Sequence, residues 1–161
     1  GMSGCEAAAI FIAQNRGAGA DKRMLSGFAR AAVMLVGTGL VSSVIMRQAA
    51  RPLALIFLDP EAQAVPYAVS YLRLIALFYF LSFTGHLFVG WYRGTGRMNI
   101  TFYGTTLQII IRVVGTYLLI DAMGLDAVAL ATGLGWVGVV TFWSILVRRD
   151  QARLSPSQPG A

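Results

Sequence analysis

The sequence predicts an all-α integral membrane protein: a helical bundle made of the end of one transmembrane helix and four full transmembrane helices. Two observations carry this prediction. Only 12% of the 161 residues are charged and 57% are hydrophobic, whereas a soluble domain has about 25% charged residues. The hydrophobic residues also gather in five stretches, four of which reach the roughly 20 residues that cross a bilayer.

The first apolar stretch, Cys5–Ala13, is about half as long as the roughly 20 residues that a spanning helix needs. We therefore expect it to be the end of a helix whose beginning is missing from the chain. It contains Glu6, the only acidic side chain that we expect at membrane depth. The glycine-containing basic decapeptide Gln14–Arg23 follows and predicts a loop outside the lipid.

The remaining stretches predict the four full spans and their connections. Pro52–Leu58 is apolar but too short to cross, so we expect a helix lying at the membrane interface. Asp59-Pro60-Glu61 predicts a helix start, with Asp as N-cap and Pro at the first helical position. We expect residues 1–149 to form one membrane unit and residues 150–161, rich in Ser, Pro and Gln, to form a disordered tail. The predicted spans are Gly27–Met46, Ala64–Tyr92, Met98–Ile120 and Ala127–Val147.

The orientation follows from the cations, which lie in clusters between the apolar stretches. This distribution indicates a lipid bilayer, not a nucleic acid, as the partner of this chain of net charge +6. The positive-inside rule places the richer side in the cytoplasm, so segments 14–26 and 93–97 and the C-terminus are expected there, in a multi-pass protein of the cell membrane. The richer side carries Arg16, Lys22, Arg23, Arg30, Arg93, Arg97, Arg148, Arg149 and Arg153; the other carries Arg47 and Arg51.

A polar stripe marks the stretch Met98–Ile120. Its members recur every three or four residues and therefore share one helix face. Polar groups in lipid are costly, so the stripe should face the bundle interior or a wet cavity. It could contact substrate, with Gln108 and Arg112 as binding residues, or it could hold helices together by hydrogen bonds. Arg112 fits a structural role better, because a fixed cation is a poor lining for cationic cargo. The stripe comprises Thr101, Thr105, Gln108, Arg112 and Gly115.

The preceding span carries Tyr79, Phe83 and His86 on one face. Aromatic faces attract organic cations, and His titrates near neutral pH. These residues could form a substrate-binding wall with His86 as a proton-binding group. They could equally be packed or lipid-facing aromatic residues beside a hydrogen-bonded His.

The last span carries a small-residue face, Ala131, Gly135 and Gly138, which predicts close helix packing. The chain has one His and one Cys, Cys5, and shows no catalytic or metal-binding set. We therefore expect no enzyme activity, no metal site and no cofactor.

Phe11–Gly19, Asp59-Pro60-Glu61 with Tyr71-Leu-Arg73, and Tyr92–Gly96 occur in an order that matches one transporter family. These segments resemble the MATE (multidrug and toxic compound extrusion) transporters. Phe11–Gly19 is similar to the segment after that family's eighth helix. The region that begins at Asp59-Pro60-Glu61 and ends at Tyr92-Arg93-Gly94-Thr95-Gly96 is similar to the family's tenth helix. The eleventh helix is similar to Arg112 followed by Tyr117-Leu-Leu and Gly124-Leu.

The resemblance extends to about Arg149 and implies part of the C-terminal lobe of a twelve-helix transporter. It implies export of small amphipathic or cationic organic substrates by antiport driven by sodium or protons, together with a missing N-terminal lobe. The family's coupling carboxylates lie in that lobe, and in some members also on the seventh and tenth helices. No Asp or Glu occurs between Ala62 and Tyr92, so the ion site should lie outside this chain.

Two other functions stay open. A flippase for lipid-linked oligosaccharides, of the same wider superfamily, would favour basic residues such as Arg112 facing the cavity, because its substrates carry phosphate. A truncated membrane protein that only packs with other helices would not transport.

Overall fold

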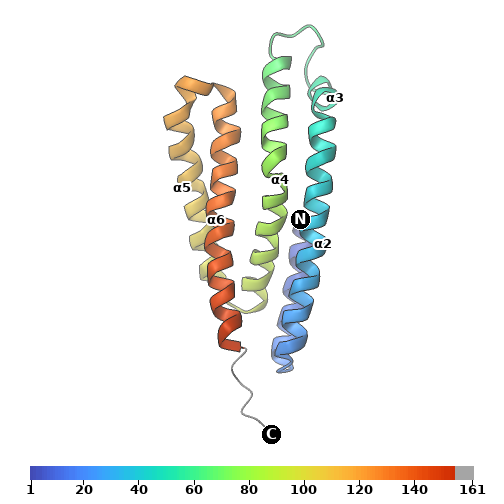
Figure 1. The fold of residues 1–161 in the computed structure, drawn as a ribbon, viewed down its shortest axis with the longest axis vertical. Helices are drawn as coiled ribbons and strands as arrows, with labels where there is room; N and C mark the ends of the chain where they lie inside the picture. Colours follow the sequence, from blue (N-terminus) through green and yellow to red (C-terminus); the bar gives the residue numbers. More distant parts are fainter. Residues whose placement is uncertain (155–161) are drawn as a thin grey trace.

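The computed structural model describes residues 1–154, and this part of the chain forms six α-helices and no strand (Figure 1). The predicted all-α bundle is confirmed. The helices are α1 (Met2–Gly17), α2 (Asp21–Gln48), α3 (Ala50–Leu55), α4 (Val65–Gly94), α5 (Met98–Met123) and α6 (Leu125–Leu154).

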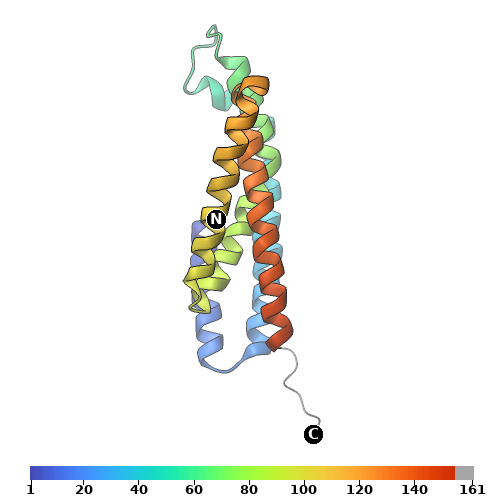
Figure 2. The ribbon, with the colours of Figure 1, turned by 90° about the vertical axis from the view of Figure 1, so that its left-hand side faces the viewer.

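Helices α2, α4, α5 and α6 are long and apolar enough to cross a membrane. At 1.5 Å per residue even α5, with 26 residues, is about 39 Å long, against roughly 30 Å of hydrocarbon. The 16 residues of α1 reach only about 24 Å, and Figures 1 and 2 show this helix beside the lower half of the bundle. One partial and four full spans agree with the sequence prediction.

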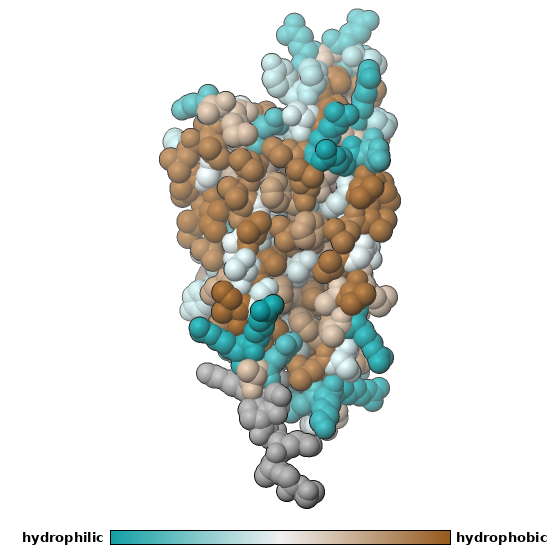
Figure 3. Space-filling view, viewed as in Figure 1, coloured by the Kyte–Doolittle hydropathy of each residue, from teal (hydrophilic) through white to brown (hydrophobic). Residues whose placement is uncertain are grey.

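The outer surface of the bundle is apolar. Figure 3 shows a broad hydrophobic band between two hydrophilic ends. On α5 the side chains of Phe102, Ile109, Val113 and Leu118 are all more than half exposed, and no residue of this helix's most apolar window is buried. Side chains of this kind are stable in lipid and costly in water, so the chain is a multi-pass membrane protein.

The tightest core lies around the end of α4. Trp91 and Tyr92 are fully buried there, and the ring of Phe28 meets Trp91 edge-on at 4.8 Å between centroids. Gly90 allows α1 to approach, because a Cβ at this position would lie 2.8 Å from the carbonyl oxygen of Cys5. The short α1 is thereby held against α4.

Small residues bring α5 and α6 together, as the sequence predicts. A Cβ on Gly135 would lie 3.0 Å from the carbonyl oxygen of Gln108, and one on Gly138 would lie 2.7 Å from Ile111. From the other side, a Cβ on Gly115 would lie 3.1 Å from that of Ala131. The glycines of this segment therefore serve helix packing.

The predicted connections are too long. Helix α1 continues to Gly17 and α2 begins at Asp21, so most of segment 14–26 is helical; Gly124 alone separates α5 from α6. Gly124 has a φ of 57°, which lets the chain turn within one residue and which other residues rarely adopt. Only residues 95–97 of the predicted loop 93–97 are non-helical.

Two further boundaries differ from the prediction. Asp59-Pro60-Glu61 lies in turns and does not start a helix; α4 begins at Val65, where Pro66 occupies the first turn and needs no hydrogen-bond partner. The predicted disordered tail is wrong for residues 150–154, which extend α6, because Gln, Ala, Arg and Leu are good helix formers. Residues 155–161 lie outside the described part.

Candidate functional site

A cavity of about 330 Å³ lies between α1, α4, α5 and α6. Its wall combines aromatic and aliphatic side chains with a few polar groups, the usual composition of a small-molecule site. The polar lining comes from Glu6 on α1, His86 and Arg93 on α4, and Thr101, Thr105 and Gln108 on α5. The structure thus brings two of the predicted site residues, His86 and Gln108, into one cavity.

His86 is fixed by its own helix and by α6. Its Nδ1 lies 2.6 Å from the carbonyl oxygen of Ser82. Since a carbonyl can only accept, Nδ1 carries a proton and donates it to this oxygen. The ring stacks on Trp136 with 6.4 Å between centroids and 27° between planes. The hydrogen bond and the stacking contact together hold the imidazole in one orientation at the cavity wall.

The polar stripe of α5 supplies the opposite wall. Thr105 donates a hydrogen bond of 3.0 Å to the carbonyl oxygen of Thr101. The Thr101 hydroxyl itself is buried and has no partner among residues 1–154. The Gln108 side chain is half-buried in the lining, and its amide can bond to a molecule in the cavity.

Arg112 does not reach the cavity. It is exposed and lies one turn beyond Gln108, where the α5 lining ends. Its predicted role in substrate binding stays a prediction, and α6 packs on the neighbouring α5 face that carries Gly104 and Gly115. Arg112 lies beside that contact.

Tyr79 and Phe83 also lie outside the cavity. Their rings pack edge-on with 5.8 Å between centroids. A Cβ on Gly39 would lie 3.0 Å from the Cβ of Phe83, so Phe83 faces α2, whereas Tyr79 is exposed. The structure therefore separates the predicted aromatic wall into a packing pair and His86.

Trp136 and Trp143 of α6 complete the cavity, and the sequence patterns indicate neither of them, nor Arg93, as a lining residue. Trp143 is buried, and its indole N–H donates a hydrogen bond of 3.2 Å to the carbonyl oxygen of Ile100. The two indoles are seven residues apart, which places them on one helix face. This spacing is the signal that could have identified them.

Glu6 is the only acidic residue in the lining. Its side chain is exposed on α1, on the side of the cavity opposite to α6. Within residues 1–154 no group of three or more His, Cys, Asp or Glu side chains is arranged to hold a metal ion.

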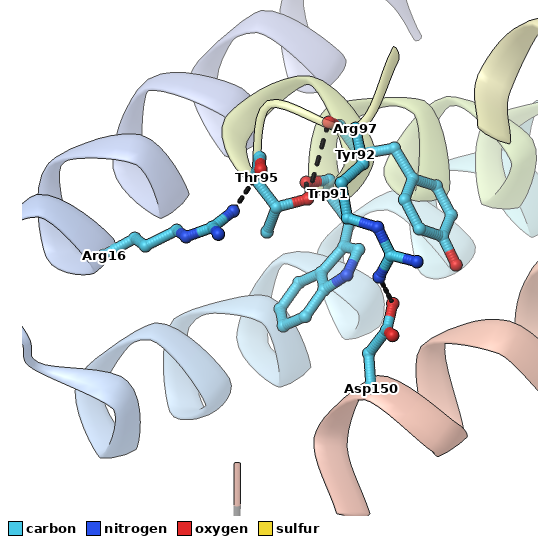
Figure 4. Close-up of polar contacts among 6 residues, drawn as sticks. All are labelled: Arg16, Trp91, Tyr92, Thr95, Arg97 and Asp150. Carbon is cyan, nitrogen blue, oxygen red and sulfur yellow. Dashed lines mark hydrogen bonds and ion pairs between the residues drawn. The ribbon is translucent and has the colours of Figure 1, made fainter. Parts of the chain in front are cut away.

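A polar cluster ties the helices together at the turn between α4 and α5 (Figure 4). Arg97 forms an ion pair with Asp150 of α6 at 2.6 Å, and Arg16 of α1 donates to the carbonyl oxygen of Thr95. The hydrogen bond to Asp150 raises the pKa of the Arg97 guanidinium. One turn therefore connects α1, α4, α5 and α6 at this end.

Comparison with known proteins agrees with this architecture. The MatE family model matches residues 1–118, well over half of the chain. No curated protein and no solved structure matches the chain. The chain combines membrane-length helices with a cavity lined by polar and aromatic side chains. Together with the match over residues 1–118, this architecture shows that the chain belongs to the MatE family of membrane transporters.

Proposed function

We propose that this chain forms part of an exporter of small amphipathic or cationic organic compounds, driven by antiport of sodium or protons. The cavity between α1, α4, α5 and α6 is the observation that carries the proposal. It would form one wall of a larger central cavity, completed by a second lobe that rocks against this one.

Apart from Arg93, the cavity lining suits an organic cation. Trp136 and Trp143 offer aromatic faces, which attract cations within about 6 Å of the ring. Glu6 supplies the single carboxylate of the lining, and Gln108 supplies a neutral hydrogen-bonding group. A site with aromatic faces and few fixed polar groups can accept many amphipathic shapes, as multidrug export requires.

Proton coupling has a candidate pair in the same cavity. Glu6 and His86 both line it, and a carboxylate and an imidazole can each accept a proton. Protonation of either group would weaken cation binding by removing a negative charge or adding a positive one. Proton uptake by the cavity would then release the cargo. In the sodium alternative, the ion site lies in the second lobe.

The richer basic end of the bundle supports an orientation in the cell membrane. Arg16, Arg97, Arg148 and Arg149 all lie at the end that carries the 95–97 turn. We propose that this end is cytoplasmic, in agreement with the positive-inside rule.

A flippase for lipid-linked oligosaccharides is the second candidate. Arg93 favours it, as the one basic side chain in the cavity lining and hence the one partner for a phosphate. Arg112, which would strengthen this alternative, lies outside the lining.

The test is ethidium accumulation in bacterial cells that lack their own efflux pumps and express the complete reading frame. Gln108→Ala should raise intracellular ethidium about fivefold at equal protein level, because a hydrogen bond is worth about 1 kcal/mol. Ile109→Ala is the matched control, since the Ile109 side chain follows Gln108 in the sequence and is 52% exposed on the outer face.

Wild-type accumulation in both Gln108→Ala and His86→Ala cells would refute the proposed site. If the wild-type protein exports no organic cation and instead translocates a lipid-linked oligosaccharide, the flippase is correct. Arg93→Gln should then abolish translocation.

A further inference from the structure

A second cleft, of about 730 Å³, opens at the opposite end of the bundle, where α2, α3 and α4 meet. Arginines from all three helices line it: Arg47 from the last turn of α2, Arg51 from α3 and Arg73 from α4. Arg47 and Arg51 are close in the sequence, and the chain folds back after α3 (Figure 1), so that Arg73 lines the same cleft.

The charges in this cleft are not neutralised by the protein. No Asp or Glu lines it, and the one ion pair within residues 1–154 joins Arg97 to Asp150. Asp126, the nearest acid on α6, accepts a hydrogen bond of 2.7 Å from Ser70 at the cleft wall. Asp59 and Glu61 flank the lining residue Pro60 without lining the cleft themselves. Three guanidinium groups are therefore available to an anion.

Apart from Ser70, the remaining lining is apolar and continues toward the lipid. Val69, Leu74 and Leu77 lie beside the arginines, and Leu77 is 47% exposed. Arg73 is eight residues into α4, about 12 Å from its start. Figure 3 shows hydrophilic side chains at this end directly above the hydrophobic band. The cleft therefore lies at the boundary between headgroups and acyl chains.

We propose that this cleft binds an anionic phospholipid. The phosphate lies among Arg47, Arg51 and Arg73, and one acyl chain follows Leu74 and Leu77 into the bilayer. A free phosphate would use the arginines alone and would leave the apolar half of the cleft uncovered.

The test is lipid retention by the purified chain in nanodiscs of phosphatidylcholine with one-fifth phosphatidylglycerol. Native mass spectrometry after transfer to detergent should show phosphatidylglycerol retained at least tenfold over phosphatidylcholine. The triple change Arg47→Gln, Arg51→Gln and Arg73→Gln should remove this preference. The matched control, Lys22→Gln, Arg148→Gln and Arg149→Gln, takes three exposed cations from the opposite end and should keep it.

Two further arms separate the headgroup from the whole lipid. Neither inorganic phosphate nor glycerophosphoglycerol at 10 mM should displace the bound lipid, whereas excess phosphatidylglycerol should. Full displacement by either soluble anion would overturn the lipid assignment. Equal retention by the arginine variant and the wild type, with circular dichroism showing both folded, would overturn the site; Arg73→Gln alone, which changes one side chain, serves if the triple variant unfolds.

Discussion

At the residue scale, two turns with the same local sequence adopt the same conformation. Arg16-Gly17-Ala18-Gly19 ends α1 and Arg93-Gly94-Thr95-Gly96 ends α4. Gly19 and Gly96 have φ values of 65° and 69°. In each turn, the residue after this glycine donates to a carbonyl five residues back, at 2.9 Å and 2.8 Å. This is the Schellman pattern, which satisfies the last carbonyls of a helix. The similarity is visible in the sequence, but the extension of the helices into both segments is not.

The left-handed conformation makes Gly96 sensitive to substitution. A Cβ there meets nothing within 4 Å, so Gly96→Ala should destabilise the protein by about 1–2 kcal/mol through backbone strain alone. Denaturant unfolding in detergent measures this. The control is Gly17→Ala, a helical position with equally open space, which should be neutral or slightly stabilising. Equal effects of the two changes would contradict the account.

The ion pair between Arg97 and Asp150 should contribute little by itself. The Arg97 side chain is 47% exposed, so solvent screening limits the coupling to about 0.2–1 kcal/mol. A double-mutant cycle of Arg97→Gln and Asp150→Asn measures it. The pKa of Arg97 is raised above its already high unfolded-state value. The stabilisation from the Arg97 charge is therefore fully present at any pH below that unfolded-state pKa. The Arg97 charge should therefore cause no pH dependence of stability between about pH 5 and 9. A coupling above 2 kcal/mol would show that the pair is effectively buried.

At the scale of the helices, hydropathy predicts the interiors of the spans and fails at their ends. Apolar windows locate α2, α4, α5 and α6 because a bilayer requires them. The ends depend on single residues: Gly124 turns the chain in one step, and Pro66, not Pro60, occupies the first turn of α4. The α6 extension past Val147 is polar and so carries no hydropathy signal.

Close packing of α2 on α4 depends on Gly39. A Cβ there would lie 2.9 Å from the Cα of Phe80, a backbone atom that cannot move alone. Gly39→Ala should therefore destabilise the helix pair by about 1–3 kcal/mol. Gly37→Ala, two residues away and open on all sides, should stabilise by about 0.5–1 kcal/mol. Thermal unfolding of the two variants in one detergent compares them; a loss of stability in Gly37→Ala as large as in Gly39→Ala would refute this packing.

At the scale of the whole molecule, part of the site could be predicted because it depends on one helix at a time. The periodicity of α5 groups Thr101, Thr105 and Gln108, and all three line the cavity. Periodicity cannot say which neighbour covers a face or where a cavity ends. Arg112 therefore falls beyond the cavity, Phe83 packs against α2, and Tyr79 is exposed.

The orientation of the molecule is open to direct labelling. In a Cys5→Ser background, Ala18→Cys and Gln63→Cys place single thiols at exposed positions in the turns at opposite ends. A membrane-impermeant maleimide added to intact cells should label position 63 and spare position 18 until the cells are opened. The reverse pattern would invert the proposed topology.

The most direct test of the proposed cavity is equilibrium binding of tetraphenylphosphonium to the purified complete transporter, read by quenching of tryptophan fluorescence. Glu6→Gln and Gln108→Leu should each raise the Kd about tenfold, since losing a charged or buried polar partner costs about 1.4 kcal/mol or more. Arg112→Gln, outside the lining, should bind as the wild type does. Unchanged binding by both cavity variants, or a tenfold loss confined to Arg112→Gln, would contradict the account.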